Sequence, residues 1–122
     1  MITNNQPLLN DDVLLNIARD VLDIEAAALT ALKNHLNTDF TQAVRAILAC
    51  QGRLVVSGMG KSGHIANKIA ATFASTGTPS FFVHPAEASH GDLGMITGDD
   101  VVLALSNSGN SDELMAILPA LK

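Results

Sequence analysis

A glycine-rich turn with one lysine and one serine is the part of this sequence best suited to chemistry. It reads Gly58-Met59-Gly60-Lys61-Ser62-Gly63 and follows the apolar segment 54–57. The residues after the turn have apolar side chains at helical spacing, with alanines between them. A turn from a strand into a helix points unpaired backbone N–H groups and the positive end of the helix dipole at an anion. We therefore expect Gly60, Lys61 and Ser62 to bind a negatively charged group.

Several kinds of turn compete for this spacing. A Walker A loop requires a glycine five residues before Gly60, where this sequence has Val55. The dinucleotide fingerprint G-x-G-x-x-G is satisfied, but it also requires an acidic residue at the end of the next strand. That position holds His84-Pro85, and the first carboxylate after it is Glu87. A sugar-phosphate site fits best, while a turn in which the glycines serve geometry alone stays open.

A second turn is rich in hydroxyl groups and follows another apolar segment, 101–105. It reads Ser106-Asn107-Ser108-Gly109-Asn110-Ser111 and leads into a predicted helix. Turns at the carboxyl ends of parallel strands lie on the edge where open α/β folds bind ligands. We expect Ser106, Ser108 and Ser111 to bind a phosphate group there. The alternative is that these serines only cap the helix.

Three titratable side chains follow the second and third predicted strands. Glu113 falls in the first turn of the last helix, where it could act as a general base or form a capping box with Asn110. His84 and His90 lie in a predicted loop after the second strand, and such side chains suit sugar hydroxyls or a metal ion. No third metal ligand is evident, so sugar binding is favoured.

Composition restricts the class of protein. The chain has 122 residues, enough for one modest core, and a net charge of -5 that argues against nucleic-acid binding. No apolar run approaches the roughly 18 residues of a membrane span, and the N-terminus lacks the features of a signal peptide. Because Cys50 is the single cysteine, we expect no internal disulfide and a cytoplasmic protein. The two turns predict a small molecule as its ligand.

The N-terminal part predicts two helices. Residues 1–10 suggest a disordered lead, and a helix of about 25 residues follows with an apolar stripe near the 3.6-residue period. The stripe consists of Leu14, Ile17, Val21, Ile24, Ala28, Leu32 and Leu36. This helix is longer than the core of such a domain needs, so we expect a homo-oligomer, a dimer or tetramer with sites near subunit interfaces. A second helix begins at Thr38, with Gly52 as its C′ residue.

Apolar strands alternate with helices in the rest of the chain. The predicted strands are 54–57, 80–83 and 101–105, and Gly77 is expected to end the helix between the first two. The prediction is an α/β fold: a three-layer α/β/α parallel sheet, doubly wound and flavodoxin-like, truncated after about three strands and preceded by two N-terminal helices. Residues 11–122 are expected to be the incomplete N-terminal part of one domain.

Four ordered motifs closely resemble those of D-arabinose 5-phosphate isomerases, whose catalytic domain is the sugar isomerase (SIS) domain. The resemblance covers nearly the whole chain from about residue 11 onward. The motifs are Gly58-Met59-Gly60-Lys61-Ser62-Gly63-His64, the segment from Ala74 to Pro85, His90-Gly91-Asp92-Leu93-Gly94-Met95, and Ser106-Asn107-Ser108-Gly109.

The resemblance implies interconversion of D-ribulose 5-phosphate and D-arabinose 5-phosphate, without a required cofactor, for 3-deoxy-D-manno-octulosonate synthesis. It implies catalytic roles for Lys61 and Glu113. It also assigns Gly77, Thr78, His84 and His90 to the substrate site, and His84 to an inhibitory zinc ion. The family has a further catalytic glutamate and histidine in later segments, usually followed by two CBS domains, which this sequence does not reach. A non-catalytic SIS module that binds sugar phosphates is the alternative.

Overall fold

The computed structural model describes residues 9–121, so the predicted disordered lead lies outside the described residues except for its last two positions. The chain divides into two compact units between Thr41 and Gln42.

The first unit contains one long helix, α1 (Asp11–Ala31), with 21 residues. Its N-terminus is capped by Asn10, whose Oδ1 accepts a hydrogen bond from the Val13 N–H at 2.9 Å. A short 3-10 segment, η1 (Leu32–His35), follows directly, so the α-helix ends five residues before the last apolar position predicted for it. The helices of the described part are too short or too polar to cross a membrane.

Helix α2 (Thr38–Leu48) crosses the division between the units and leads into the second one. The prediction that Gly52 ends this helix as its C′ residue is wrong, because α2 ends four positions earlier. Gly52 is required for close packing instead: a Cβ atom there would lie 2.3 Å from Asp100 Oδ1. The Gly52 N–H also donates to the Asp99 carbonyl at 2.8 Å. This bond links the segment before the first strand to the segment before the third strand.

The second unit contains a parallel sheet of three strands in the order β2-β1-β3. The strands are β1 (Leu54–Gly58), β2 (Ser80–Phe82) and β3 (Val101–Leu105). Leu54 of β1 is paired with Ser80 on one side and with Val101 on the other. The helical segments between and after them are α3 (Gly60–Ser75), α4 (Pro85–Ser89), η2 (Asp92–Met95) and α5 (Asp112–Leu121).

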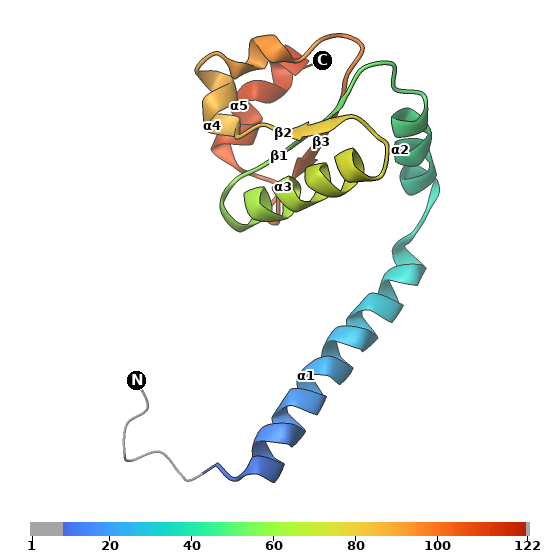
Figure 1. Cartoon of the computed structure of the whole chain (residues 1–122), viewed down its shortest axis with the longest axis vertical. Helices are drawn as coiled ribbons and strands as arrows, with labels where there is room; N and C mark the ends of the chain where they lie inside the picture. The colour runs from blue at the N-terminus through green and yellow to red at the C-terminus, as the bar shows by residue number, and fades with distance from the viewer. Residues whose placement is uncertain (1–8, 122) are drawn as a thin grey trace. The chain divides into compact units, whose positions relative to one another are not determined.

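Each face of the sheet is covered by helices (Figure 1). Leu54 and Val56 of β1 pack against Ala66 and Ala70 of α3 on one face. Val55 points to the other face, where its cluster includes residues of α4 and α5. All five residues of β1 are buried, as expected for the central strand of a parallel sheet. The predicted three-layer α/β/α architecture is confirmed.

The end of α3 and the segment after β2 test two local predictions. Gly77 has a φ of 103° and the Thr78 N–H donates to the Phe73 carbonyl at 2.9 Å, which confirms the predicted glycine cap. The segment after β2 is not the predicted loop, since α4 forms there with Pro85 in its first turn. Its N-cap is His84, which sequence reasoning considered only as a ligand-binding side chain.

A buried carboxylate fixes the amino end of the sheet. Asp100 accepts hydrogen bonds from the Arg53 N–H at 2.7 Å and the Thr97 N–H at 2.8 Å, and its side chain is 2% exposed. The N–H groups of Thr97 and Arg53 lower the pKa of the Asp100 carboxyl from its ordinary value, against the opposing effect of burial. The guanidinium of Arg53 reaches the Met95 carbonyl at 2.9 Å and lies over the Phe81 ring.

Candidate functional site

The two predicted anion-binding turns leave the sheet side by side. Gly58, the last residue of β1, is paired with Leu105, the last residue of β3. The glycine turn follows the first of these residues and the serine turn follows the second. Both turns therefore begin at the same level of the carboxyl edge, where ligands bind in open α/β sheets.

A cavity of about 240 Å³ lies between the turns. Four predicted binding residues, together with neighbouring residues of the two turns, line it. The lining residues are Met59, Ser62, Leu105, Ser106, Asn107, Ser108 and Ser111. Of the predicted site residues, Ser62, Ser106, Ser108 and Ser111 are thus brought together. Sequence reasoning missed Met59 and Asn107, although both lie inside the motifs it used.

The glycine turn presents the uncapped N-terminus of α3 to this region. Met59 is the N-cap residue and makes no side-chain capping hydrogen bond. The first backbone bond of the helix runs from the Gly63 N–H to the Met59 carbonyl at 3.2 Å, so the preceding amides have no helical partner. Lys61 lies exposed in this first turn, and Gly60 has a φ of 57°, which favours glycine. Amide dipoles and an ammonium group together favour an anion here.

The outer glycines of the motif are required for close packing. A Cβ atom on Gly63 would lie 2.6 Å from the Gly58 carbonyl oxygen, and one on Gly58 would lie 2.9 Å from the Ser62 carbonyl oxygen. Nothing lies within 4 Å of a Cβ atom on Gly60. The motif therefore combines close contact between β1 and α3 with an open position beside Lys61.

The serine turn is held by its own hydroxyl oxygens. Ser106 Oγ accepts from the Gly109 N–H at 2.9 Å, and Ser108 Oγ accepts from the Asn110 N–H at 3.1 Å. A hydroxyl group that accepts one bond still has a proton to donate. Ser106 and Ser108 can therefore shape the turn and donate to a ligand in the cavity at the same time.

Glu113 adjoins the cavity through Ser111. The Met115 N–H donates to the Ser111 carbonyl at 2.9 Å, which makes Ser111 the residue that precedes α5. Its Oγ donates to Glu113 Oε2 at 3.2 Å. This bond takes the place of the predicted capping box with Asn110, because the helix begins one residue later than that box requires. The carboxylate of Glu113 and the ammonium of Lys61 thus each belong to the first turn of a helix that adjoins the cavity.

The two predicted histidines occupy the ends of α4. His84 follows the carboxyl end of β2, and its Nδ1 accepts from the Ala86 N–H at 3.2 Å, which leaves Nε2 for a ligand. His90 follows α4 and is exposed. Within residues 9–121 no group of three or more His, Cys, Asp or Glu side chains is arranged to hold a metal ion. A zinc ion on His84 stays a prediction.

Gly77 and Thr78 lie at the opposite edge of the sheet. They precede β2, whose first residue, Ser80, is paired with the first residue of β1. The strands are parallel, so these residues are at the amino edge, a full strand length from the turns after Gly58 and Leu105. The chain does not bring Gly77 and Thr78 into the cavity with the serine turn.

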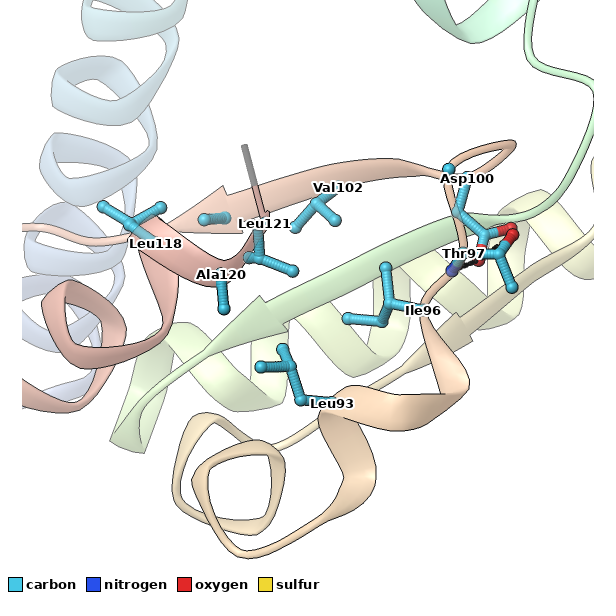
Figure 2. A pocket seen from close by; sticks show the side chains of 10 residues that line it. Leu93, Ile96, Thr97, Asp100, Val102, Leu118, Ala120 and Leu121 are labelled. Atoms are coloured by element: carbon cyan, nitrogen blue, oxygen red, sulfur yellow. Dashed lines mark hydrogen bonds between the residues drawn. The ribbon is translucent and has the colours of Figure 1, made fainter.

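A larger cavity of about 580 Å³ lies beside β3 and is lined mainly by apolar side chains (Figure 2). Leu93 and Ile96 come from η2 and the residue after it, Val102 from β3, and Leu118 and Leu121 from α5. Asp100 contributes its charge, but both of its carboxylate oxygens already accept backbone hydrogen bonds. The smaller cavity is therefore better suited to a sugar phosphate.

Comparison with known proteins assigns the chain to a family. Residues 47–122 match the profile of the SIS domain. The chain belongs to the SIS-domain family. The two turns described above both lie within the matched region of this SIS domain, whereas α1 precedes it.

Individual relatives of this SIS-domain protein are also similar in sequence and structure. It is 62% identical over 104 residues to arabinose 5-phosphate isomerase KdsD of Yersinia pestis, and 60% identical over 104 residues to KdsD of Escherichia coli K12. Each match covers 85% of this chain and 32% of the relative, so the chain spans about a third of the length of these relatives. A solved structure from E. coli CFT073, in complex with arabinose 5-phosphate, superposes with a TM-score of 0.86 at 47% identity, covering 93% of this chain and 60% of that one.

Proposed function

We propose that this protein acts as an aldose–ketose isomerase that interconverts D-ribulose 5-phosphate and D-arabinose 5-phosphate. The observation that carries the proposal is the cavity shared by the glycine turn and the serine turn. Hydroxyl groups line this cavity, and the helices α3 and α5 begin beside it. Lys61 and Glu113 lie in the first turns of these two helices, at the same edge of the sheet. The similarity to KdsD proteins and to a structure in complex with arabinose 5-phosphate supports this substrate.

In the proposed mechanism the serine turn holds the phosphate. Ser106, Ser108 and Ser111 donate their hydroxyl protons to its oxygens, and the amides at the start of α5 add their dipoles. Binding energy from this non-reacting end positions the carbonyl end of the open-chain sugar. His90 contacts sugar hydroxyls or assists ring opening, and His84 binds the substrate through Nε2.

The chemical step is a proton transfer between two neighbouring carbons. A base removes a proton from C1 of the ketose, which gives a cis-enediolate, and the proton is returned to C2 while another moves from O1 to O2. Lys61 stabilises the oxyanion that develops on the substrate, the kind of preorganised charge that supplies much of the rate enhancement. Glu113 serves as the base or orients it. No redox cofactor takes part, and the product supplies 3-deoxy-D-manno-octulosonate synthesis.

Gly77 and Thr78 enter this proposal only through a second copy of the chain. They lie at the amino edge of their own sheet, so a site that includes them would form where subunits meet. This assignment comes from the family resemblance and from the predicted homo-oligomer.

A direct assay tests the proposed function. D-Ribulose 5-phosphate is incubated with the 122-residue chain and, in parallel, with the chain continued by the remaining segment of a KdsD relative. The proposal predicts formation of D-arabinose 5-phosphate by the continued protein, with loss of activity when Lys61 is replaced by Ala. Binding of the sugar phosphate without isomerisation by either protein would contradict it and favour the non-catalytic module.

A further inference from the structure

The apolar stripe on α1 contains a repeat that two identical helices could share. Leu14, Ile17, Val21, Ile24, Ala28 and Ala31 follow one another at spacings of three and four residues, which is the a/d pattern of a coiled coil. The four large side chains among them are 47%, 50%, 47% and 69% exposed. No residue of α1 is buried in the described structure. The stripe therefore lacks the cover that apolar helix faces usually have.

We infer that α1 forms an antiparallel pair with α1 of a second copy of this chain, in a register that places Val21 against the partner's Ile24. The same register places Leu14 against the partner's Ala31 and Ile17 against the partner's Ala28. The outer layers each join a large side chain to an alanine, and the central layers join Val21 to Ile24, so no layer pairs two of the largest or two of the smallest side chains. A parallel pair would instead stack leucine on leucine at one end and alanine on alanine at the other.

The charges that flank the seam favour the same direction. In a parallel pair Asp20 at position g would face the partner's Glu25 at position e, twice by symmetry, which is a like-charge contact. In the antiparallel pair Glu25 lies beside the partner's Ala18, and Asp20 lies beside the partner's Ala27. The acidic first turn of each helix, with Asp11 and Asp12, then lies beside the C-terminal end of the partner helix. The basic residues Lys33 and His35 follow that end, so opposite charges meet there.

A neighbouring stripe, Leu15, Leu22 and Leu29, is also exposed but is a poorer seam. Its companion positions at helical spacing are Ala18 and Glu25, so a charge interrupts the apolar surface. The a/d stripe has no charged residue between Leu14 and Ala31 at its own positions. We therefore place the contact between the two helices on the a/d stripe.

Disulfide crosslinking tests the direction and register. In a Cys50→Ser background, Ile17→Cys protein is mixed with Ala28→Cys protein and oxidised gently. The antiparallel register predicts a crosslinked species in the mixture and none in either protein alone, because two copies of position 17 would be roughly 16 Å apart along the helices. A disulfide requires Cα atoms within about 7 Å. Arg19→Cys mixed with Ala26→Cys, at outward f positions of the same register, is the matched control and should stay uncrosslinked.

Sedimentation equilibrium tests the seam itself. The wild-type chain should have the mass of a dimer or a multiple of it, and Val21→Asp with Ile24→Asp should weaken association by on the order of a hundredfold or more. Leu22→Asp makes the same chemical change on the neighbouring stripe and should leave association within about threefold of wild type. A monomeric wild-type chain, crosslinking of Ile17→Cys protein with itself, or a dimer insensitive to the two aspartates would overturn the inference.

Discussion

The hydroxyl of Ser57 donates a hydrogen bond to the carbonyl oxygen of Val83, with 2.5 Å between the two oxygens. Ser57 is 2% exposed and lies in the central strand, and Val83 immediately precedes His84. The Val83 N–H also donates to the Val56 carbonyl at 2.9 Å, after which β2 leaves the sheet. The serine hydroxyl therefore fixes the end of β2 at the point from which the chain turns toward His84.

Replacing Ser57 by Ala should lower the free energy of unfolding by about 1–2 kcal/mol, because the Val83 carbonyl would stay buried without this donor. If His84 binds substrate, the KM for D-ribulose 5-phosphate should rise as well. Ser80→Ala is the matched control, since Ser80 Oγ donates to the Leu54 carbonyl at 2.7 Å at the other end of β2. Urea unfolding and steady-state kinetics measure both effects. Equal KM values for the two variants would contradict the positioning role of Ser57.

Replacing Lys61 by Ala should reduce turnover by about 100- to 1000-fold, because the developing oxyanion would lose its neighbouring positive charge. The control is Lys68→Ala, which removes an exposed lysine from the same helix α3, farther from the cavity. Circular dichroism should show both variants folded. Turnover within a few-fold of wild type for Lys61→Ala would remove Lys61 from the mechanism.

Replacing Ser108 by Ala should raise KM about tenfold, because one hydroxyl donor to the phosphate is lost together with the acceptor for the Asn110 N–H. Ser108→Thr keeps the hydroxyl group and should stay close to wild type. Initial rates over a range of D-ribulose 5-phosphate concentrations separate KM from turnover. If the threonine variant were as impaired as the alanine variant, the hydroxyl would not be the group that matters.

Replacing Asp100 by Asn should cost about 2 kcal/mol of stability at neutral pH, because an amide cannot accept the bonds from both the Arg53 and Thr97 N–H groups. The folded state lowers the pKa of Asp100 below the ordinary 3.8, so the carboxylate stabilises the fold above that pH. The contribution is lost as the pH falls through the lowered pKa. Chemical unfolding of both proteins between about pH 7 and about pH 2 should therefore show the difference shrinking in acid. A difference that is independent of pH would contradict this role.

Periodicity and turn chemistry predicted most of the sheet. The segments 54–57 and 101–105 are nearly all apolar, a pattern that a buried parallel strand requires, and the structure differs from these predictions by at most one residue. The glycine cap at Gly77 was also predictable, because it depends only on the local preference of glycine for positive φ. The end of α2 could not be predicted from the sequence. The glycine at position 52 is needed because Asp100 lies against it, and a contact with a residue so distant in the sequence leaves no local signal.

Only the part of the site that is independent of strand order could be predicted from the sequence. Both turns follow parallel strands, so any order puts them on one edge, but only the adjacency of β1 and β3 puts them at one cavity. The contribution of Ser57 could not be predicted, because a serine inside an apolar strand gives no hint of its partner 26 residues away. Gly77 and Thr78 show the opposite case, since the family resemblance assigns them to a site that lies at the other edge of their own sheet.

The central claim is that the glycine turn and the serine turn bind one sugar phosphate between them. A titration of the ¹⁵N-labelled chain with D-arabinose 5-phosphate, followed by two-dimensional NMR, tests it directly. The account predicts that the amide signals of Lys61 and Ser62 shift together with those of the turn 106–111, with a single dissociation constant, while Gly52 at the amino edge stays still. Shifts in one turn only, different dissociation constants for the two turns, or no shift in either would contradict the account.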